Sequence, residues 1–211
     1  MTKAEQLTAH ANSIHVRFEK EGIKNEAARS NNRTKNKRDG HFSDDQSGWE
    51  TGENEIATGI PFFDHMLNGF ARHGLFDLKV HVTGDLEVDS HHTIEDTGIV
   101  LGQAIAAALG EKKGIKRYGS FLLPMDETLA MCAVDLSGRP YLNYQAEFTV
   151  EKLGTLDTEM IREFFYAVSY SAAMNLHLKI VDGGNNHHMA EALFKAFGKG
   201  SWIWQPWRNH V

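Results

Sequence analysis

The chain has 211 residues, of which 41% are hydrophobic and 24% are charged. This balance is typical of one soluble globular domain, or of two small halves that share a core. The formal net charge of −6 argues against nucleic acid as the main partner. No apolar run approaches the roughly 18 residues that a membrane helix needs. The single cysteine, Cys132, excludes an internal disulfide and indicates a reducing environment. We therefore expect a cytoplasmic protein with neither a nucleic-acid nor a membrane partner.

The first 50 residues differ in composition from the rest of the chain. The stretch 26–48 is rich in Asn, Arg, Lys, Asp and Ser and has almost no apolar periodicity. Such a composition predicts a disordered N-terminal segment over residues 1–50. The basic run at 29–38 leaves a contact with nucleic acid or a membrane surface as an open alternative.

Helices and strands alternate in the first half of the ordered chain. The first predicted helix begins at Pro61, which is favoured in a first helical turn, and ends near Gly74. A strand is predicted over 75–82, where apolar residues alternate with polar ones. A second helix is predicted over 91–110, with Ser90 as its N-cap residue.

The second half has a similar sequence of elements. A strand over 121–136 and a return strand over 141–150 predict a hairpin, because Ser-Gly-Arg-Pro between them has turn chemistry. A long amphipathic helix is predicted after Thr158, and a strand over 176–181. The last predicted helix follows Asn186, another favourable N-cap residue.

One short pattern occurs twice, as His91-His92-Thr93-Ile94-Glu95 and as His187-His188-Met189-Ala190-Glu191. In a helix, the first histidine and the glutamate lie on the same side, and the second histidine points roughly 100° away. Two histidines that diverge in this way serve two metal ions more easily than one. The two copies supply four imidazoles and two carboxylates, which suit a dinuclear site. A single His-His pair is more often an exposed helix start, but two copies favour metal binding.

The order of helix, strand, turn and His-His-x-x-Glu helix also occurs twice. His187 follows His91 by 96 positions, and residues 78–80 resemble residues 178–180. We therefore predict an internal duplication. The fold class is α+β, with two pseudo-repeated half-domains, each a small mixed β-sheet with helices packed on one face. The halves are predicted at about 51–120 and 121–199, followed by an atypical tail over 200–211 that contains three tryptophans.

Six stretches of the chain resemble imidazoleglycerol-phosphate dehydratase, an enzyme family of histidine biosynthesis. They are Thr58–Leu67, Asp89–Asp96, Gly114–Gly119, Pro124–Glu127, Asp135–Tyr141 and Asn186–Phe197. The resemblance covers roughly residues 51–199. It implies a hydro-lyase (a carbon-oxygen lyase) that dehydrates D-erythro-imidazole glycerol phosphate to imidazole acetol phosphate with two Mn(II) ions per site. It also implies a homo-oligomer built from trimers, with sites at subunit interfaces.

In this family the metal ligands come from the two motifs and from one extra residue in each half. The resemblance implies these ligands: His65, His91, His92, Glu95, Glu163, His187, His188 and Glu191. Glu163 stands where the family usually has a histidine, and manganese accepts a carboxylate readily. A solvent-facing helix glutamate is the alternative for this residue. The ligand types alone leave Mn(II), Fe(II), Co(II) and Zn(II) open.

The resemblance also implies the residues that act on the substrate. Proton transfer needs positioned carboxylates or imidazoles, and cationic side chains suit a phosphate dianion. The expected catalytic residues are Glu95, Glu191, His92 and His188, and the expected substrate-binding residues are His73, Arg117, Arg139 and Lys195. For each cation, an ordinary surface charge is the alternative. Asp64 and Asp96 adjoin expected ligands and are predicted to accept hydrogen bonds from imidazole N–H groups.

Both ends of the chain depart from the family pattern. No stretch of residues 1–50 aligns with the first strand of the family, whose glutamate reaches the substrate. The tryptophan-containing tail stands in place of a tail with Ser and Lys. We hypothesise that both ends were replaced, for instance by frameshifted reading, which predicts an unpaired sheet edge. The alternative to an active dehydratase is therefore a metal-binding relative with altered termini and weak or absent activity.

Overall fold

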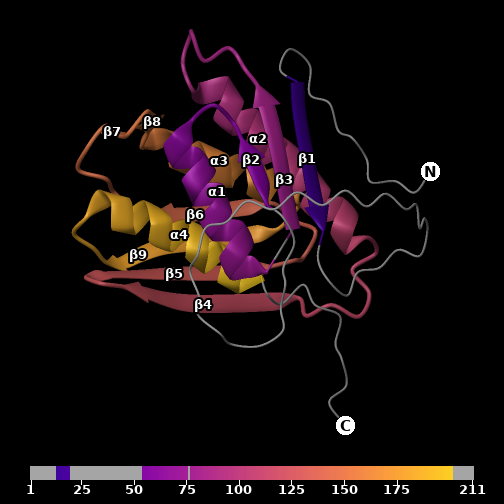
Figure 1. Cartoon of the computed structure of the whole chain (residues 1–211). Coiled ribbons are helices and arrows are strands. Elements are labelled where there is room, and N and C mark those ends of the chain that lie inside the picture. The colour runs from indigo at the N-terminus through magenta and orange to yellow at the C-terminus, as the bar shows by residue number, and fades with distance from the viewer. Residues whose placement is uncertain (1–12, 20–53, 76, 202–211) are drawn as a thin grey trace, which may run out of the picture.

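The structure is a computed structural model that describes residues 13–19, 54–75 and 77–201 (Figure 1). Its helices are α1 (Pro61–Gly74), α2 (His91–Leu109), α3 (Glu159–Ser171) and α4 (Asn186–Gly200). Its strands are β1 (Ser13–Glu19), β2 (Glu55–Ala57), β3 (Asp77–Thr83), β4 (Tyr118–Met125), β5 (Thr128–Asp135), β6 (Tyr141–Gln145), β7 (Lys152–Leu153), β8 (Leu156–Asp157) and β9 (Asn175–Asp182). Residues 202–211 of the tryptophan-containing tail and most of the predicted disordered segment lie outside the described residues.

The strand order confirms the predicted duplication and the α+β class. The first sheet has the order β1-β3-β2, in which β1 is antiparallel and β2 parallel to β3. The second sheet has the order β4-β5-β9-β6, in which β5 is antiparallel and β6 parallel to β9. β1, β3 and β2 therefore correspond to β5, β9 and β6, and α1 and α2 correspond to α3 and α4.

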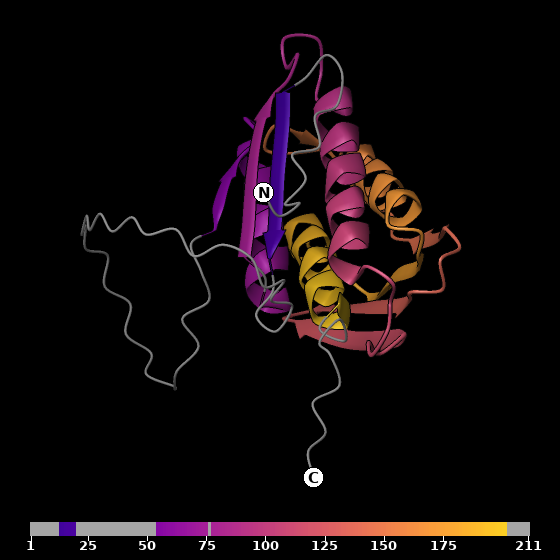
Figure 2. The ribbon, with the colours of Figure 1, turned by 90° about the vertical axis from the view of Figure 1, so that its right-hand side faces the viewer.

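The helices lie between the two sheets, as Figure 2 shows. α2 packs on β1, α4 packs on β4 and β5, and the helices pair as α1 with α4 and α2 with α3. Their apolar faces meet in a cluster of buried aromatic rings, in which Phe63 contacts Phe164 edge to face and Phe164 stacks on Phe194. The phenylalanines on the buried faces of α1, α3 and α4 therefore belong to the hydrophobic core. Among the described helices, none is both long and apolar enough to cross a membrane.

Two glycines, one in each half, lie at equivalent helix crossings. A Cβ atom on Gly198 of α4 would lie 2.5 Å from the carbonyl oxygen of Phe70 in α1, and a Cβ atom on Gly102 of α2 would lie 2.7 Å from that of Val168 in α3. Gly198 follows Gly102 by 96 positions, as His187 follows His91. The two helix pairs therefore cross in the same way, at a distance that only glycine permits.

The predicted hairpin between 121–136 and 141–150 is wrong. Residues 118–135 themselves form the hairpin, β4 and β5, with Asp126 in the left-handed region at its turn (φ 51°). β6 pairs with β9 in parallel instead of pairing with β5. The Ser-Gly-Arg-Pro segment does turn the chain, but β9 occupies the edge of β5 that the return strand would have needed.

The prediction of disorder and of an unpaired sheet edge is corrected at residues 13–19. These residues form β1, which pairs antiparallel with the whole of β3, from Ser13 opposite Thr83 to Glu19 opposite Asp77. In the sequence, apolar residues alternate here as Ile14, Val16 and Phe18, a period that fits a strand. Because β2 pairs with the other edge of β3, both edges of β3 are occupied.

The N-cap residues differ in part from those predicted. Asn185, one residue before the predicted Asn186, caps α4 and accepts hydrogen bonds from the backbone N–H groups of His187 and His188. Ser90 occupies the N-cap position of α2, but it is the carboxylate of Asp89 that accepts the N–H of His91. Asx side chains accept backbone N–H groups two residues on, which explains both shifts.

Candidate metal centre

His65, His187 and Glu191 form a group of possible metal ligands. His187 and Glu191 lie one helical turn apart on α4, with 3.3 Å between Nε2 and Oε2, and α1 brings Nε2 of His65 to 3.6 Å from Oε1 of Glu191. The ligand atoms of all three residues lie within 4.8 Å of one another. Two imidazoles and a carboxylate from two helices therefore converge on one small volume.

Glu191 is unusual because it is a buried carboxylate, 8% exposed, at the floor of this group. Burial alone would raise its pKa, but the hydrogen bond and charge of Lys195, together with His65 and His187, lower the pKa below its ordinary value. Nζ of Lys195 lies 2.8 Å from Oε1 of Glu191. His73 lies nearby at the end of α1, and its pKa is lowered by burial and by the charge of Lys195.

His188 points to a second group, formed with the β4–β5 turn. Its Nδ1 lies 3.0 and 3.2 Å from the two carboxylate oxygens of Glu127, and its Nε2 lies 4.0 Å from the carboxylate of Asp126. Glu127 also accepts the backbone N–H of Asn185 at 2.8 Å. This N–H and the hydrogen bond with His188 lower the pKa of Glu127 to about 2.

The first-half motif has the same local geometry at the start of α2. His91 and Glu95 lie one turn apart, with 3.7 Å between Nε2 and Oε2. Nδ1 of His92 lies 3.1 Å from Oδ2 of Asp85 in the loop after β3, and this hydrogen bond raises the pKa of His92. His91 and His92 are exposed, and Glu95 is half-buried.

Glu163 is half-buried on α3, the helix that packs against α2. One of its carboxylate oxygens accepts a hydrogen bond from Nη1 of Arg162 at 2.7 Å. Within the described residues, Glu163 does not form a three-ligand group with His91 and Glu95. Its role as a metal ligand therefore stays a prediction.

The two arginines expected to bind substrate lie at the far end of the second sheet. Arg117 makes a two-pronged ion pair with Asp135 at the end of β5. Arg139 follows in the Ser-Gly-Arg-Pro turn, where it is exposed and its charge helps to lower the pKa of Asp135, after the larger effect of the hydrogen bond from Arg117. Glu127 and His188 lie at the other end of β5, whose first residue is Thr128. Eight strand residues span roughly 23 Å.

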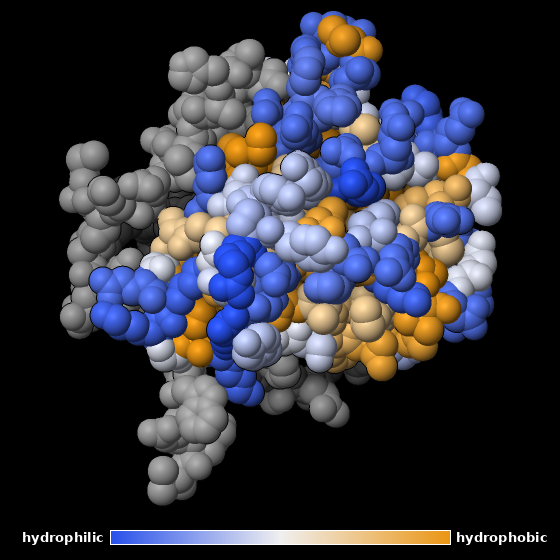
Figure 3. Space-filling view, turned by 180° about the vertical axis from the view of Figure 1, so that it is seen from behind, coloured by the Kyte–Doolittle hydropathy of each residue, from blue (hydrophilic) through white to orange (hydrophobic). Residues whose placement is uncertain are grey.

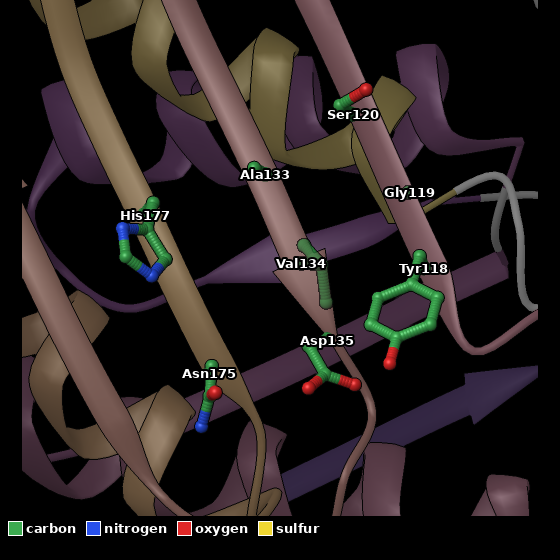
Figure 4. Close-up of a pocket in the computed structure, with 8 residues that line it drawn as sticks. All are labelled: Tyr118, Gly119, Ser120, Ala133, Val134, Asp135, Asn175 and His177. Carbon is green, nitrogen blue, oxygen red and sulfur yellow. The ribbon is translucent and has the colours of Figure 1, made fainter.

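The outer face of the second sheet, turned away from α4, carries a pocket that contains none of the expected ligands. Its lining residues, drawn in Figure 4, are Tyr118, Gly119, Ser120, Ala133, Val134, Asp135, Asn175 and His177. The tyrosine ring of Tyr141 lies 5.7 Å from the His177 imidazole on this face. Exposed large apolar side chains gather on it: Tyr118, Leu122, Tyr141 and Val181. Hydrophobic surface is visible in the lower part of Figure 3.

Among the described residues, Asp64 has its hydrogen bonds with Thr58 and not with an imidazole, contrary to the prediction. Its carboxylate accepts hydrogen bonds from both the backbone N–H and the hydroxyl of Thr58, at 2.9 and 2.6 Å, and so fixes the entry into α1. The corresponding role of Asp96 stays a prediction. The carboxylates from outside the motifs that contact the second histidines, Asp85 and Glu127, were not predicted to do so from the sequence.

The fold and these side chains define a duplicated α+β protein with histidine and carboxylate groups suited to a divalent metal. The profile of the imidazoleglycerol-phosphate dehydratase family matches residues 58–200, so the chain belongs to this family. The family resemblance found in the sequence is confirmed, and with it the class of hydro-lyases.

Two relatives that carry the family's name illustrate the match. The imidazoleglycerol-phosphate dehydratase of Lachnoclostridium phytofermentans is 72% identical over 149 residues, which are 71% of this chain and 76% of that protein. The imidazoleglycerol-phosphate dehydratase of Acetivibrio thermocellus is 61% identical over 149 residues, which are again 71% of this chain and 76% of that protein. Both matches leave part of each chain uncovered.

Solved structures of the family share the fold. The crystal structure of the enzyme from Staphylococcus aureus is 35% identical and superposes with a TM-score of 0.72, covering 92% of this chain and 94% of that one. The enzyme from Pyrococcus furiosus is 26% identical and also has a TM-score of 0.72, covering 97% of this chain and 95% of that one.

Proposed function

We propose that the chain dehydrates imidazole glycerol phosphate to imidazole acetol phosphate, a step of histidine biosynthesis. The observation that carries this proposal is the convergence of His65, His187 and Glu191 in a chain of this family. Nitrogen and oxygen donors without a thiolate fit Mn(II), which we propose as the cofactor, with two ions per site. The bound metal would supply Lewis-acid stabilisation and orientation of the substrate.

Glu163 is the proposed counterpart of His65 in the other half. Val168 follows Phe70 by 98 positions. The carbonyl oxygen of Val168 lies beside Gly102, and that of Phe70 lies beside the equivalent Gly198. The same offset relates Glu163 to His65. In one half, His65 of α1 lies beside Glu191 of α4. By the duplication, Glu163 of α3 is proposed to bind metal together with the motif of α2. The proposed ligands of this half are His91, Glu95 and Glu163, and the second histidines, His92 and His188, complete the two ligand sets.

Replacing Glu163 by alanine is expected to weaken one of the two metal sites, because one oxygen ligand is lost. Loss of a hydrogen-bonding partner of a ligand typically costs about 10- to 100-fold in metal affinity, so loss of the ligand itself costs at least about 10-fold. Glu163→His is expected to restore binding. Titration of metal-stripped protein with Mn(II) measures both effects, with Glu159→Ala, an exposed residue one turn earlier on α3, as the control. Unchanged affinity in Glu163→Ala would make Glu163 an ordinary surface residue.

The proposed proton-transfer groups are Glu95, Glu191, His92 and His188. Dehydration removes a proton from C2 and a hydroxyl from C3 of the substrate, so the site needs one group that accepts a proton and one that donates a proton to the departing hydroxyl. The lowered pKa of Glu191 keeps its carboxylate ionised near neutral pH. This supports Glu191 as a ligand or proton acceptor and not as a donor.

The substrate phosphate is proposed to bind cationic side chains from more than one copy of the chain. Lys195 and His73 lie beside Glu191, whereas Arg117 and Arg139 lie at the opposite end of β5. Because that strand spans roughly 23 Å, one chain does not bring all four to one small substrate. In a site formed at a subunit interface, Lys195 and His73 of one copy would lie near Arg117 and Arg139 of another copy.

The outer face of the second sheet supports a homo-oligomer, which we propose is built from trimers. Four large apolar side chains are exposed there, Tyr118 at 64% and Leu122 at 59% among them. Exposed apolar patches of this kind mark association surfaces in soluble proteins. We also infer a cytoplasmic enzyme, because its single cysteine is a free thiol, as is usual in a reducing compartment. The net charge of −6 supports the absence of a nucleic-acid partner.

The experiment that tests this function is an assay for imidazole acetol phosphate with metal-stripped protein before and after addition of Mn(II). Turnover that appears only after reloading is the expected result. Metal binding without turnover would instead support the second candidate, a metal-binding relative with altered termini and weak or absent activity. Absence of both metal binding and turnover would contradict the proposed function.

A further inference from the structure

The second histidine of each motif is held by a carboxylate from outside that motif. Nδ1 of His92 lies 3.1 Å from Oδ2 of Asp85, and Nδ1 of His188 lies 3.0 Å from Oε2 of Glu127. Both contacts are at hydrogen-bond distance, and both involve the same ring nitrogen. A carboxylate acceptor beside Nδ1 favours the tautomer in which Nδ1 carries the proton, so the lone pair is left on Nε2.

The two carboxylates come from positions that the duplication does not relate. Asp85 lies in the loop between β3 and α2. In the second half the corresponding loop contains Gly183 and Gly184, and the carboxylate comes from Glu127 in the β4–β5 turn, 61 residues before His188. The same ring atom is therefore held in both halves through different elements. Inheritance of one ancestral loop does not explain this, whereas a shared requirement for a fixed imidazole does.

Glu127 holds more than the ring. Its Oε1 accepts the backbone N–H of Asn185, and the side chain of Asn185 accepts the N–H groups of His187 and His188. The carboxylate therefore fixes the start of α4 and the orientation of the His188 ring together. The left-handed backbone of Asp126 at the hairpin turn precedes it (φ 51°) and contributes to placing it beside α4.

We infer that Asp85 and Glu127 are positioning residues that present Nε2 of His92 and of His188 to the metal ions. This inference rests on the proposed function, because it takes both histidines as ligands. Metal-binding histidines commonly donate their other ring N–H to a carboxylate, which orients the ring and strengthens its basicity. Glu127 and Asp85 then act through the histidines and do not themselves contact the metal or the substrate.

The test is a calorimetric titration of metal-stripped protein with Mn(II), which measures the affinity of each site. Glu127→Ala and Asp85→Ala are each expected to weaken one of the two sites by about 10- to 100-fold, and the double variant is expected to weaken both. Glu127→Gln and Asp85→Asn, which keep an acceptor oxygen beside Nδ1, are expected to recover most of the affinity. Glu147→Ala removes an exposed glutamate from the loop after β6 and is the matched control.

A structural role alone would give a different pattern. If Glu127 merely stabilised the turn, Glu127→Ala would lower the unfolding temperature of the metal-free protein while leaving the Mn(II) affinity unchanged. That result, or Mn(II) affinities of Glu127→Ala and Asp85→Ala that both equal the wild-type affinity, would overturn the inference. Failure of the wild-type protein to bind Mn(II) would instead refute the proposed function, so the two failures are distinguishable.

Discussion

Replacement of Glu191 by glutamine is expected to lower kcat/KM at least about 100-fold, which corresponds to about 2.7 kcal/mol of transition-state stabilisation. Glu191 contacts His65, His187 and Lys195 together, so its carboxylate joins a group from α1 to the motif of α4. Glutamine retains the volume and a hydrogen-bond acceptor for Lys195 but loses the negative charge that the proposed metal site requires. Steady-state kinetics and the amount of bound Mn(II) measure the effect.

Two further variants make this test specific. Glu95→Gln changes the equivalent carboxylate of the first motif and is expected to lower kcat/KM by a similar factor, because in the proposed function each half supplies one ligand set. Glu159→Gln changes an exposed glutamate at the start of α3 and should leave kinetics and metal content unchanged. Full activity in Glu191→Gln would show that this carboxylate neither binds metal nor takes part in proton transfer.

Substitution of Gly198 by alanine is expected to destabilise the protein by about 1–3 kcal/mol. The new Cβ atom would lie 2.5 Å from the carbonyl oxygen of Phe70, which belongs to the helix backbone and cannot rotate away. Gly102→Ala creates the same conflict with Val168 at 2.7 Å and is expected to have a similar effect. For a chain of this size, thermal unfolding should shift downward by about 2–4 °C per kcal/mol.

Gly69 provides the control within α1. A Cβ atom there would meet only Cγ of Lys195 at 3.7 Å, an ordinary contact. Alanine is the better helix former by up to about 1 kcal/mol, so Gly69→Ala should leave the unfolding temperature unchanged or raise it. Equal unfolding temperatures of Gly198→Ala and Gly69→Ala would contradict the close helix crossing on which the comparison of the two halves depends.

Features that depend on neighbouring residues could be predicted from the sequence. The His-His-x-x-Glu pattern needs only helical periodicity, and the two copies do begin α2 and α4. The duplication could be predicted because the second copy preserves the order of elements as well as the motif. Even the buried aromatic core follows from the apolar stripes of the helices, with Phe63, Phe164 and Phe194 meeting at its centre.

Features that depend on distant contacts could not be predicted in this way. The return strand was placed beside β5 because consecutive strands commonly pair, but β9 occupies that edge. The contact between Glu127 and His188 joins residues 61 positions apart. It depends on the turn between β4 and β5, whereas the prediction had put the hairpin turn at Ser-Gly-Arg-Pro. β1 was missed because a short alternating stretch stands beside a long polar segment whose composition dominated the prediction.

The number of Mn(II) ions bound per chain tests the central claim most directly. That claim is that the two halves of this chain each contribute a histidine and carboxylate ligand set, one of which is the group of His65, His187 and Glu191. Metal-stripped protein titrated with Mn(II), with the unbound ion followed by electron paramagnetic resonance, should take up two ions per chain. Binding of no ion would contradict the claim, and a single ion would contradict the equivalence of the two halves.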